Sequence, residues 1–152
     1  MNTQQETIVV GVDGSEHGER ALEWAVKEAG LRGARLRLVA AWHLPPAVYS
    51  GPGYIPTAGT RESFEEPAGE AAEVAAARAR DAGVEADAVV REGQAAEVLV
   101  EEAANADMLV VGSRGHGGFT GLLLGSVSAQ CAHHAVCPLV IVRPAGSGSR
   151  PA

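Results

Sequence analysis

Cysteine is scarce in this chain of 152 residues, and no apolar run approaches the length of a membrane-spanning helix. The two cysteines, Cys131 and Cys137, lie six positions apart, a spacing that does not indicate a metal site. We expect both to be free thiols, as is usual in a cytosol, and to serve as small buried residues. A redox switch built on the pair is the alternative.

Basic residues are also few. Lysine and arginine together number 12 against 19 acidic residues, which gives a net charge of -7 and a pI of about 5.2. Such a surface repels nucleic-acid phosphates, so a nucleic-acid partner is not expected. The N-terminus, MNTQQETIVV, lacks a basic segment followed by a long apolar stretch. We therefore expect a cytoplasmic protein without membrane association.

What the chain has is enough apolar sequence for a core. Hydrophobic residues make up 46% and charged residues 20%, a balance typical of a folded globule. The length suits one domain, which we place at residues 1–144, followed by a flexible tail at residues 145–152 rich in glycine and serine.

Apolar periodicity predicts an alternation of strands and helices along the whole chain. Such alternation is typical of an α/β protein, a three-layer sandwich with a mainly parallel sheet and helices on both faces. No regular structure is expected at residues 43–60, which are rich in proline and glycine. The predicted strands are 7–12, 35–42, 84–91, 107–112 and 138–143, and the predicted helices are 16–33, 63–82, 94–105 and 125–135.

The stretch VVGSRGHGGFTGLLLGSVSA, residues 110–129, is unusually rich in glycine. Glycines let backbone N–H groups approach a phosphate, and a helix beginning near Gly125 adds aligned donors and a positive dipole end. The stretch is not a Walker A loop, because the chain's single lysine, Lys27, lies far away, and it does not match G-x-G-x-x-G. We interpret it as a phosphate-binding loop; a tight structural connection is the alternative.

Two of these features follow predicted strands. Asp13 comes after the first strand and Gly112 ends the fourth. In open α/β sheets, ligands bind beyond the carboxyl ends of the strands, where the strand order reverses. If the first and fourth strands are neighbours, both loops face one cleft.

The glycine spacing also matches a known pattern. Gly112, Gly115, Gly125 and Ser126 spell G-x2-G-x9-G-S, in register with VVGVDGS near the start and LLLGSVSAQCAHHAVCPLVIVRP near the end. The chain resembles the ATP-binding branch of the universal stress protein family over residues 7–144. This resemblance implies a flavodoxin-like sheet ordered 3-2-1-4-5 and a homodimer formed through the last strand, Pro138 to Arg143. It also implies ATP, accompanied by Mg²⁺, as the ligand.

The resemblance carries binding roles over by position. Asp13 would contact the ribose or adenine, Gly11 and Val12 would line the base, and Val39 and Ala41 would meet adenine through the backbone. The residues that would surround the phosphates are Gly112, Ser113, Arg114, Gly115, His116, Gly117, Gly125, Ser126, Val127 and Ser128.

Several alternatives remain open from the residues themselves. Asp13 in DGS is also a good turn-former, and Arg114 is either a phosphate donor or a solvated loop residue. No catalytic set stands out, so at most slow ATP hydrolysis is expected from a regulatory, stress-response protein. A cyclic-AMP or AMP sensor and a nucleotide-independent dimeric interaction module are the rival functions.

Overall fold

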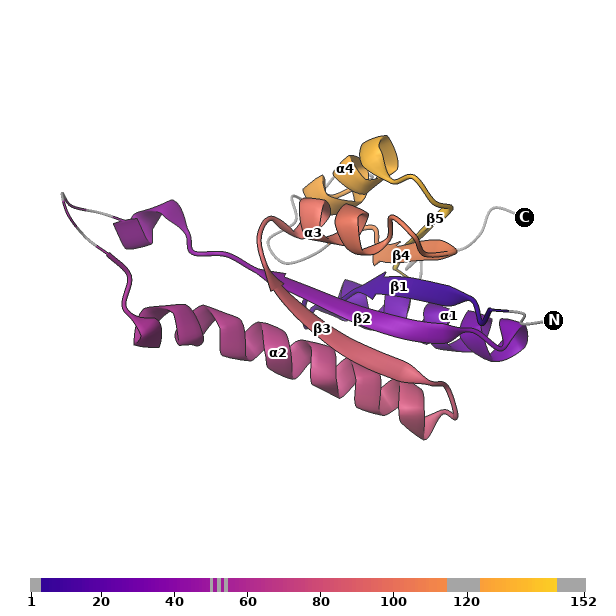
Figure 1. The fold of residues 1–152 in the computed structure, drawn as a ribbon. Helices are drawn as coiled ribbons and strands as arrows, with labels where there is room; N and C mark the ends of the chain where they lie inside the picture. The colour runs from indigo at the N-terminus through magenta and orange to yellow at the C-terminus, as the bar shows by residue number, and fades with distance from the viewer. Residues whose placement is uncertain (1–3, 50, 52, 54, 115–123, 145–152) are drawn as a thin grey trace.

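The computed structural model describes residues 4–49, 51, 53, 55–114 and 124–144. These residues form a five-stranded parallel sheet in the order β3-β2-β1-β4-β5 (Figure 1). The predicted strand order is therefore confirmed, and each predicted strand is found within two residues of its expected bounds. The strands are β1 Thr7–Gly11, β2 Arg35–Trp42, β3 Ala86–Glu92, β4 Met108–Gly112 and β5 Leu139–Val142.

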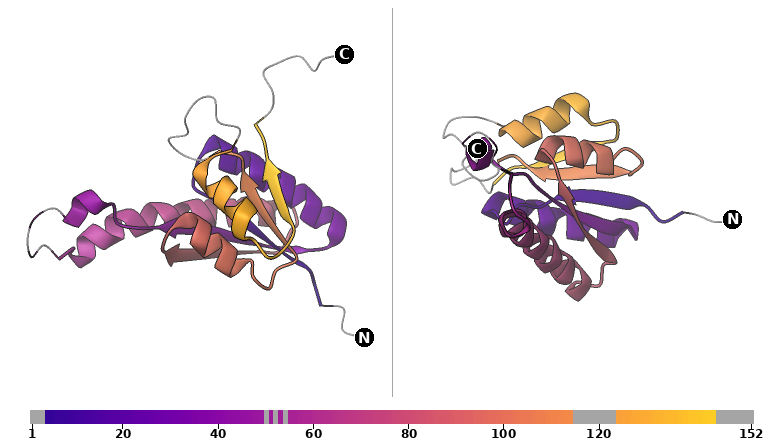
Figure 2. Two further views of the ribbon diagram at one scale, coloured as in Figure 1. Left: turned by 90° about the horizontal axis from the view of Figure 1, so that it is seen from above. Right: turned by 60° about the vertical axis from the view of Figure 1, so that its left-hand side comes forward.

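Helices cover both faces of this sheet, as the α/β pattern predicts. Two long helices, α1 Glu16–Arg32 and α2 Ala58–Asp81, pack on one face, and two short ones, α3 Ala95–Glu102 and α4 Ser126–His134, pack on the other (Figure 2). The result is a three-layer sandwich.

The central strands are continuous apolar runs because both of their faces are buried. Alternate residues point to opposite sides, so Val10 joins the core beneath α1 and α2, while Val9 joins the core beneath α3 and α4. On the long-helix side, α1 and α2 contribute mostly alanines, which let the helix backbones lie close to the sheet.

The start and end of α1 follow from two residues predicted to cap it. Ser15 is the N-cap, and its hydroxyl accepts a hydrogen bond from the Gly18 N–H at 3.1 Å. Gly33 ends the helix with a φ of 68°, the left-handed conformation that favours glycine.

The prediction for residues 43–60 is partly wrong. A short 3-10 helix, η1, occupies Pro46–Tyr49, and α2 begins at Ala58, five residues before the predicted Ser63. Thr57 explains the early start, because its hydroxyl accepts the Thr60 N–H at 3.2 Å and so caps the helix. Arg61 then stacks over Trp42 at 5.5 Å and pairs with Glu92, which fixes the first turn to the sheet.

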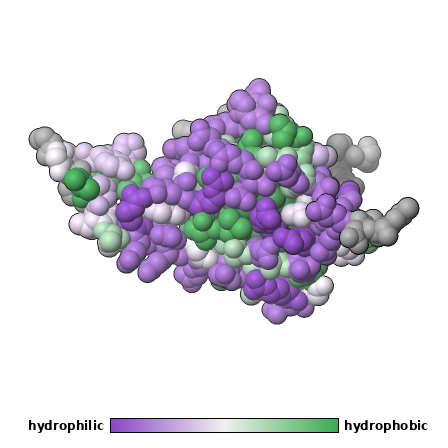
Figure 3. Space-filling model, in the orientation of Figure 1, coloured by the Kyte–Doolittle hydropathy of each residue, from purple (hydrophilic) through white to green (hydrophobic). Residues whose placement is uncertain are grey.

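The surface is mostly hydrophilic on the side seen in Figure 3, with separate apolar patches between the charged regions. None of the described helices is long and apolar enough to cross a membrane.

Candidate functional site

The carboxyl ends of β1, β2 and β4 meet at one edge of the sheet, because β1 pairs in parallel with both of the others. Asp13 follows β1 and Gly112 ends its neighbour β4, so both lie at the same edge, as the cleft hypothesis requires. We call this place the carboxyl edge; it comprises residues 12–15, the end of β2, and the two ends of the β4–α4 connection.

Asp13 organises the turn between β1 and α1. Its Oδ1 accepts hydrogen bonds from the Ser15 N–H at 2.8 Å and from the Ser15 hydroxyl. This is the turn-forming role that the sequence offered as an alternative. Asp13 is nonetheless exposed to solvent at the carboxyl edge, so the turn role leaves it accessible to a ligand.

Two glycines are required here by packing. A Cβ on Gly18 would lie 2.9 Å from Asp13 Oδ1, so glycine leaves room for the carboxylate over the first turn of α1. A Cβ on Gly112 would lie 2.8 Å from the backbone oxygen of His17. Sequence reasoning assigned Gly112 to the phosphates and missed Gly18; a glycine three positions after an N-cap was the available signal.

The two ends of the β4–α4 connection are tied together. The Gly125 N–H donates to the Ser113 carbonyl at 2.6 Å, and the Ser113 N–H donates to the Val142 carbonyl at 2.9 Å. The Ser128 side chain is buried, and its hydroxyl donates to the Ser113 carbonyl at 2.9 Å. Ser128 thus links the start of α4 to the end of β4 through a buried hydrogen bond.

The N-terminus of α4 faces this junction with its backbone donors. Gly125 is the N-cap and supplies no side-chain hydrogen bond. The first intrahelical bond runs from the Ala129 N–H to the Gly125 carbonyl. The N–H groups of Ser126, Val127 and Ser128 precede it and have no acceptor within the helix. Together with the helix dipole, these donors favour an anion.

The end of β2 also offers backbone groups, the N–H and C=O of Ala41. The Val39 carbonyl accepts the Val12 N–H at 2.9 Å, so Val39 faces β1. In a parallel sheet the N–H and C=O of one residue point to the same neighbour, and alternate residues point the same way. Ala41 therefore also faces the β1 side, but the pairing of β1 with β2 ends at Gly11 and Val39. Its N–H and C=O extend past the last β1–β2 pair.

Some predicted site residues cannot be placed in this way. Gly115, His116 and Gly117 lie outside the described residues, while Arg114 is half-buried directly after Ser113. Gly11 and Val12 lie where expected, at the end of β1. Among the residues that the structure describes, no three His, Cys, Asp or Glu side chains gather as a metal site.

The two cysteines are free thiols, as expected. Cys131 is a residue of α4 whose side chain is fully buried in the core, and burial raises the pKa of its thiol to about 11. Cys137 is half-buried, and burial likewise raises its thiol pKa. The interpretation as small buried residues fits Cys131 fully and Cys137 in part.

Comparison with known proteins agrees with this architecture. The model of the universal stress protein family matches residues 5–143. A universal stress protein of Mycolicibacterium smegmatis is 38% identical over 140 residues, covering 90% of this chain and 45% of the relative. One from Thermus aquaticus is 34% identical over 140 residues, covering 90% of this chain and 98% of the relative.

Solved structures show the same fold. A universal stress protein in complex with cAMP is 30% identical, with a TM-score of 0.67 over 93% of this chain and 98% of that one. An Arabidopsis thaliana family protein with AMP bound is 23% identical, with a TM-score of 0.65 over 91% of each chain. An Archaeoglobus fulgidus protein in complex with dAMP is 24% identical, with a TM-score of 0.66 over 91% of this chain and 98% of that one.

This chain spans about half the length of the first curated relatives that it matches. A family match over residues 5–143 covers most of the chain. The chain therefore belongs to the universal stress protein family.

Proposed function

For this member of the universal stress protein family, we propose that the carboxyl edge binds ATP and that nucleotide occupancy regulates a stress response. The carrying observation is the N-terminus of α4, which Gly125 caps without a side-chain bond and which the Gly125–Ser113 hydrogen bond holds beside the end of β4. Phosphates would accept from the N–H groups of Ser126 and Val127. Mg²⁺ would arrive with the triphosphate.

Adenine recognition would use the backbone of Ala41. The edge of adenine presents a donor, the 6-amino group, beside an acceptor, N1, and the C=O and N–H of one β-residue form the matching pair. Gly11 and Val12 would line the base, with Val39 beneath it, and Asp13 would accept from the ribose hydroxyls. In this proposal Asp13 holds the turn and contacts the sugar.

The remaining phosphate contacts fall on the β4–α4 connection. Gly112 would bring the end of β4 close to the ligand, and Ser113 and Arg114 would lie beside the phosphates. Ser128 would hold Ser113 in place through the hydrogen bond from its buried hydroxyl to the Ser113 carbonyl. The same proposal includes Gly115, His116 and Gly117. The proposed role is binding, with at most slow hydrolysis.

A second ligand class has its own support. The relative in complex with cAMP is 30% identical to this chain, and more distant family members hold AMP and dAMP. A site that holds an adenine base and one phosphate could bind cyclic AMP or AMP in addition to ATP. A cyclic-AMP or AMP sensor is therefore the second candidate.

Titration calorimetry with Mg-ATP, AMP and cyclic AMP tests both functions. The informative variant is Ser126→Glu, because Ser126 is exposed at the first position of α4. A glutamate there suits the helix dipole and preserves folding, but it occupies and repels the phosphate position. We expect ATP affinity to fall at least about tenfold, which corresponds to about 1.4 kcal/mol.

Gln130→Glu is the matched control, since it adds the same charge to an exposed position one turn further along α4. ATP affinity should remain near that of the unmodified protein in this variant. Absence of adenine-nucleotide binding at millimolar concentration would end the proposal. Tighter binding of cyclic AMP than of ATP would favour the sensor.

We also propose a cytoplasmic homodimer formed through Pro138 to Arg143. β5 lies at the edge of the sheet, and its four residues are only half-buried. An edge strand of this kind pairs readily with a second copy across a two-fold axis. A monomer by light scattering at micromolar concentration would contradict the dimer. The two free thiols support the cytoplasmic location.

A further inference from the structure

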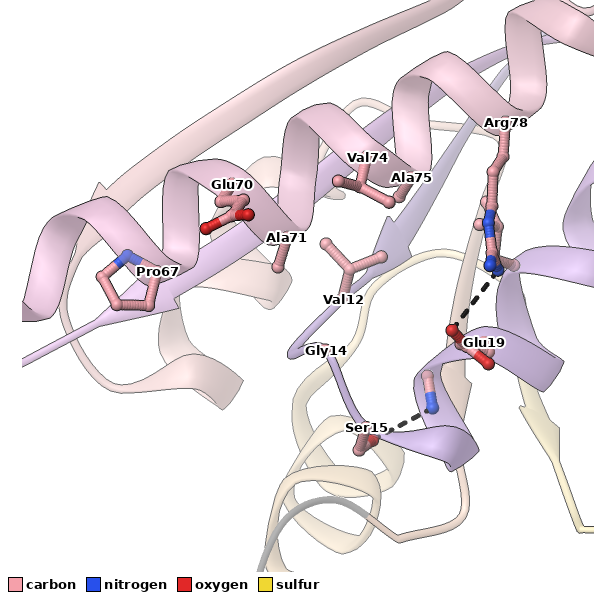
Figure 4. A pocket seen from close by; sticks show the side chains of 12 residues that line it. Val12, Gly14, Ser15, Glu19, Pro67, Glu70, Ala71, Val74, Ala75 and Arg78 are labelled. Atoms are coloured by element: carbon pink, nitrogen blue, oxygen red, sulfur yellow. Dashed lines mark hydrogen bonds and ion pairs between the residues drawn. The ribbon is translucent and has the colours of Figure 1, made fainter.

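A groove runs between the first turns of α1 and the middle of α2, beside the 12–15 turn (Figure 4). Its volume is about 290 Å³. Val12 and Leu22 form part of its floor, and Pro67, Ala71 and Val74 form the wall on α2. The nucleotide roles proposed above leave this groove unused, apart from Val12.

The wall on α2 is a stripe of small and apolar side chains. Pro67, Ala71, Val74 and Ala75 recur at helical spacing, so they share one face of the helix. Val74 is 51% exposed, although valine is usually among the most buried residue types. The stripe therefore has apolar surface that neither the sheet nor α1 covers.

Carboxylates border this apolar surface. Glu70 lies on the wall, and it makes no ion pair with any residue that the structure describes. Residues 62–74 of α2 contain five glutamates and no basic residue, and of these Glu73 is paired with Arg80. Residues 16–23 of α1 add three glutamates against one arginine. At the far end, Arg78 is already paired with Glu19 at 3.4 Å (Figure 4).

We propose that this groove docks a basic amphipathic segment of a partner protein. An apolar side chain of the segment would sit between Leu22 and Val74, and its lysines or arginines would pair with Glu70 and the neighbouring glutamates. Amphipathic helices commonly bind in this way, with apolar anchors in a groove and charges along its rim. Charge complementarity selects a basic partner over an acidic one.

The proposal does not depend on nucleotide binding, because its anchors on α2 and its chemistry are different. The two sites share the 12–15 turn: Val12, Gly14 and Ser15 line the groove, and Asp13 faces the carboxyl edge. Failure of ATP to bind would leave the docking site intact, and failure of docking would leave the nucleotide site intact.

Fluorescence anisotropy with a labelled synthetic peptide tests the docking site. The probe carries leucines at helical spacing on one face and lysines on the other, and a scrambled peptide of equal composition is its control. We expect saturable binding of the amphipathic peptide at micromolar concentration. Val74→Asp should weaken that binding at least about tenfold, because a charge replaces the apolar wall.

Leu31→Asp is the matched control for this variant. Leu31 is 76% exposed on α1 but does not line the groove, so the same change of charge there should leave peptide affinity unaltered. Glu70→Lys should also weaken binding, and Glu85→Lys, at an exposed position before β3, should not. Thermal melts of all four variants confirm that they fold.

Several outcomes would overturn the proposal. These are equal binding of the scrambled peptide, equal losses in the matched controls, or no saturable binding of the amphipathic probe. Light scattering supplies one more test. If Val74→Asp converts an oligomer into a monomer, a second copy of this chain covers the groove and the proposed partner is wrong.

Discussion

The carboxyl edge and the opposite end of the strands, which we call the amino edge, differ in how their polar groups are satisfied. At the amino edge, side chains pair with one another: Arg35 contacts Asp87 at 3.2 Å, and Arg37 contacts Glu102 at 3.6 Å. At the carboxyl edge, the groups that we propose for nucleotide binding belong to the backbone, at Ala41 and at the start of α4. The carboxylate of Asp13 at this edge holds the turn between β1 and α1 by accepting the Ser15 N–H.

Cavity size alone would favour the amino edge over the carboxyl edge that we propose as the binding site. The amino edge holds a polar cavity of about 520 Å³ lined by Arg35, Arg37, Glu101 and Glu102. These side chains already have partners: Arg37 pairs with Glu102, Arg35 with Asp87 and Glu101 with Arg91, although the Nε of Arg35 is buried without a hydrogen-bond partner among the residues that the structure describes. Donors that already have partners gain little from a ligand, whereas N–H groups at a helix N-terminus have no acceptor within the helix and gain much more. We therefore base the proposed site on these backbone groups rather than on cavity size.

Adjacent proline substitutions should separate stability from binding most strongly. Ala40 faces β3, so Ala40→Pro removes a ladder hydrogen bond inside the sheet and should cost about 3 kcal/mol. Ala41→Pro removes an N–H that extends beyond β1, so most of the stability should survive while ATP affinity falls about tenfold. Urea unfolding and calorimetry measure the two effects. Equal destabilisation by both variants would contradict the assigned direction of Ala41.

The packing of Gly112 should show the next largest effect. In Gly112→Val, the added side chain meets the His17 carbonyl, and such overpacking costs about 1–3 kcal/mol. Gly30→Ala is the control, since nothing lies within 4 Å of that added Cβ on α1. We expect this control to gain up to about 1 kcal/mol from helix propensity. A Gly112 variant as stable as the unmodified protein would show that β4 does not need glycine there.

The smallest effect should come from the amino edge. Arg37→Ala removes a half-exposed pair with Glu102, and such pairs contribute about 0.2–1 kcal/mol. Its ATP affinity should equal that of the unmodified protein, and added salt should reduce the difference in stability. A clear loss of ATP binding would move the site to the other edge.

The sequence predicted the sheet well because buried parallel strands and capped helices leave strong local patterns, as in TIVVG and around Ser15. The start of α2 was missed because Thr57 follows a proline-rich segment that hides its role as a cap. The direction of the Ala41 backbone groups could not be predicted, because it depends on where the pairing of β1 with β2 ends. The hydrogen bond of the Ser128 hydroxyl could not be predicted either, because it depends on the close approach of Gly125 to Ser113. The glycine pattern predicts a phosphate-binding loop, which stays a prediction, and only the structure shows that a side chain at Gly112 would meet the backbone of His17.

An NMR titration of amide resonances with Mg-ATP tests the central claim most directly. If the carboxyl edge is the site, the amides of Ala41, Ser126 and Val127 shift with saturation, and those of Arg35, Arg37 and Asn105 stay in place. Shifts confined to the amino edge, or none at millimolar ATP, would contradict the proposal that the open backbone groups bind the nucleotide.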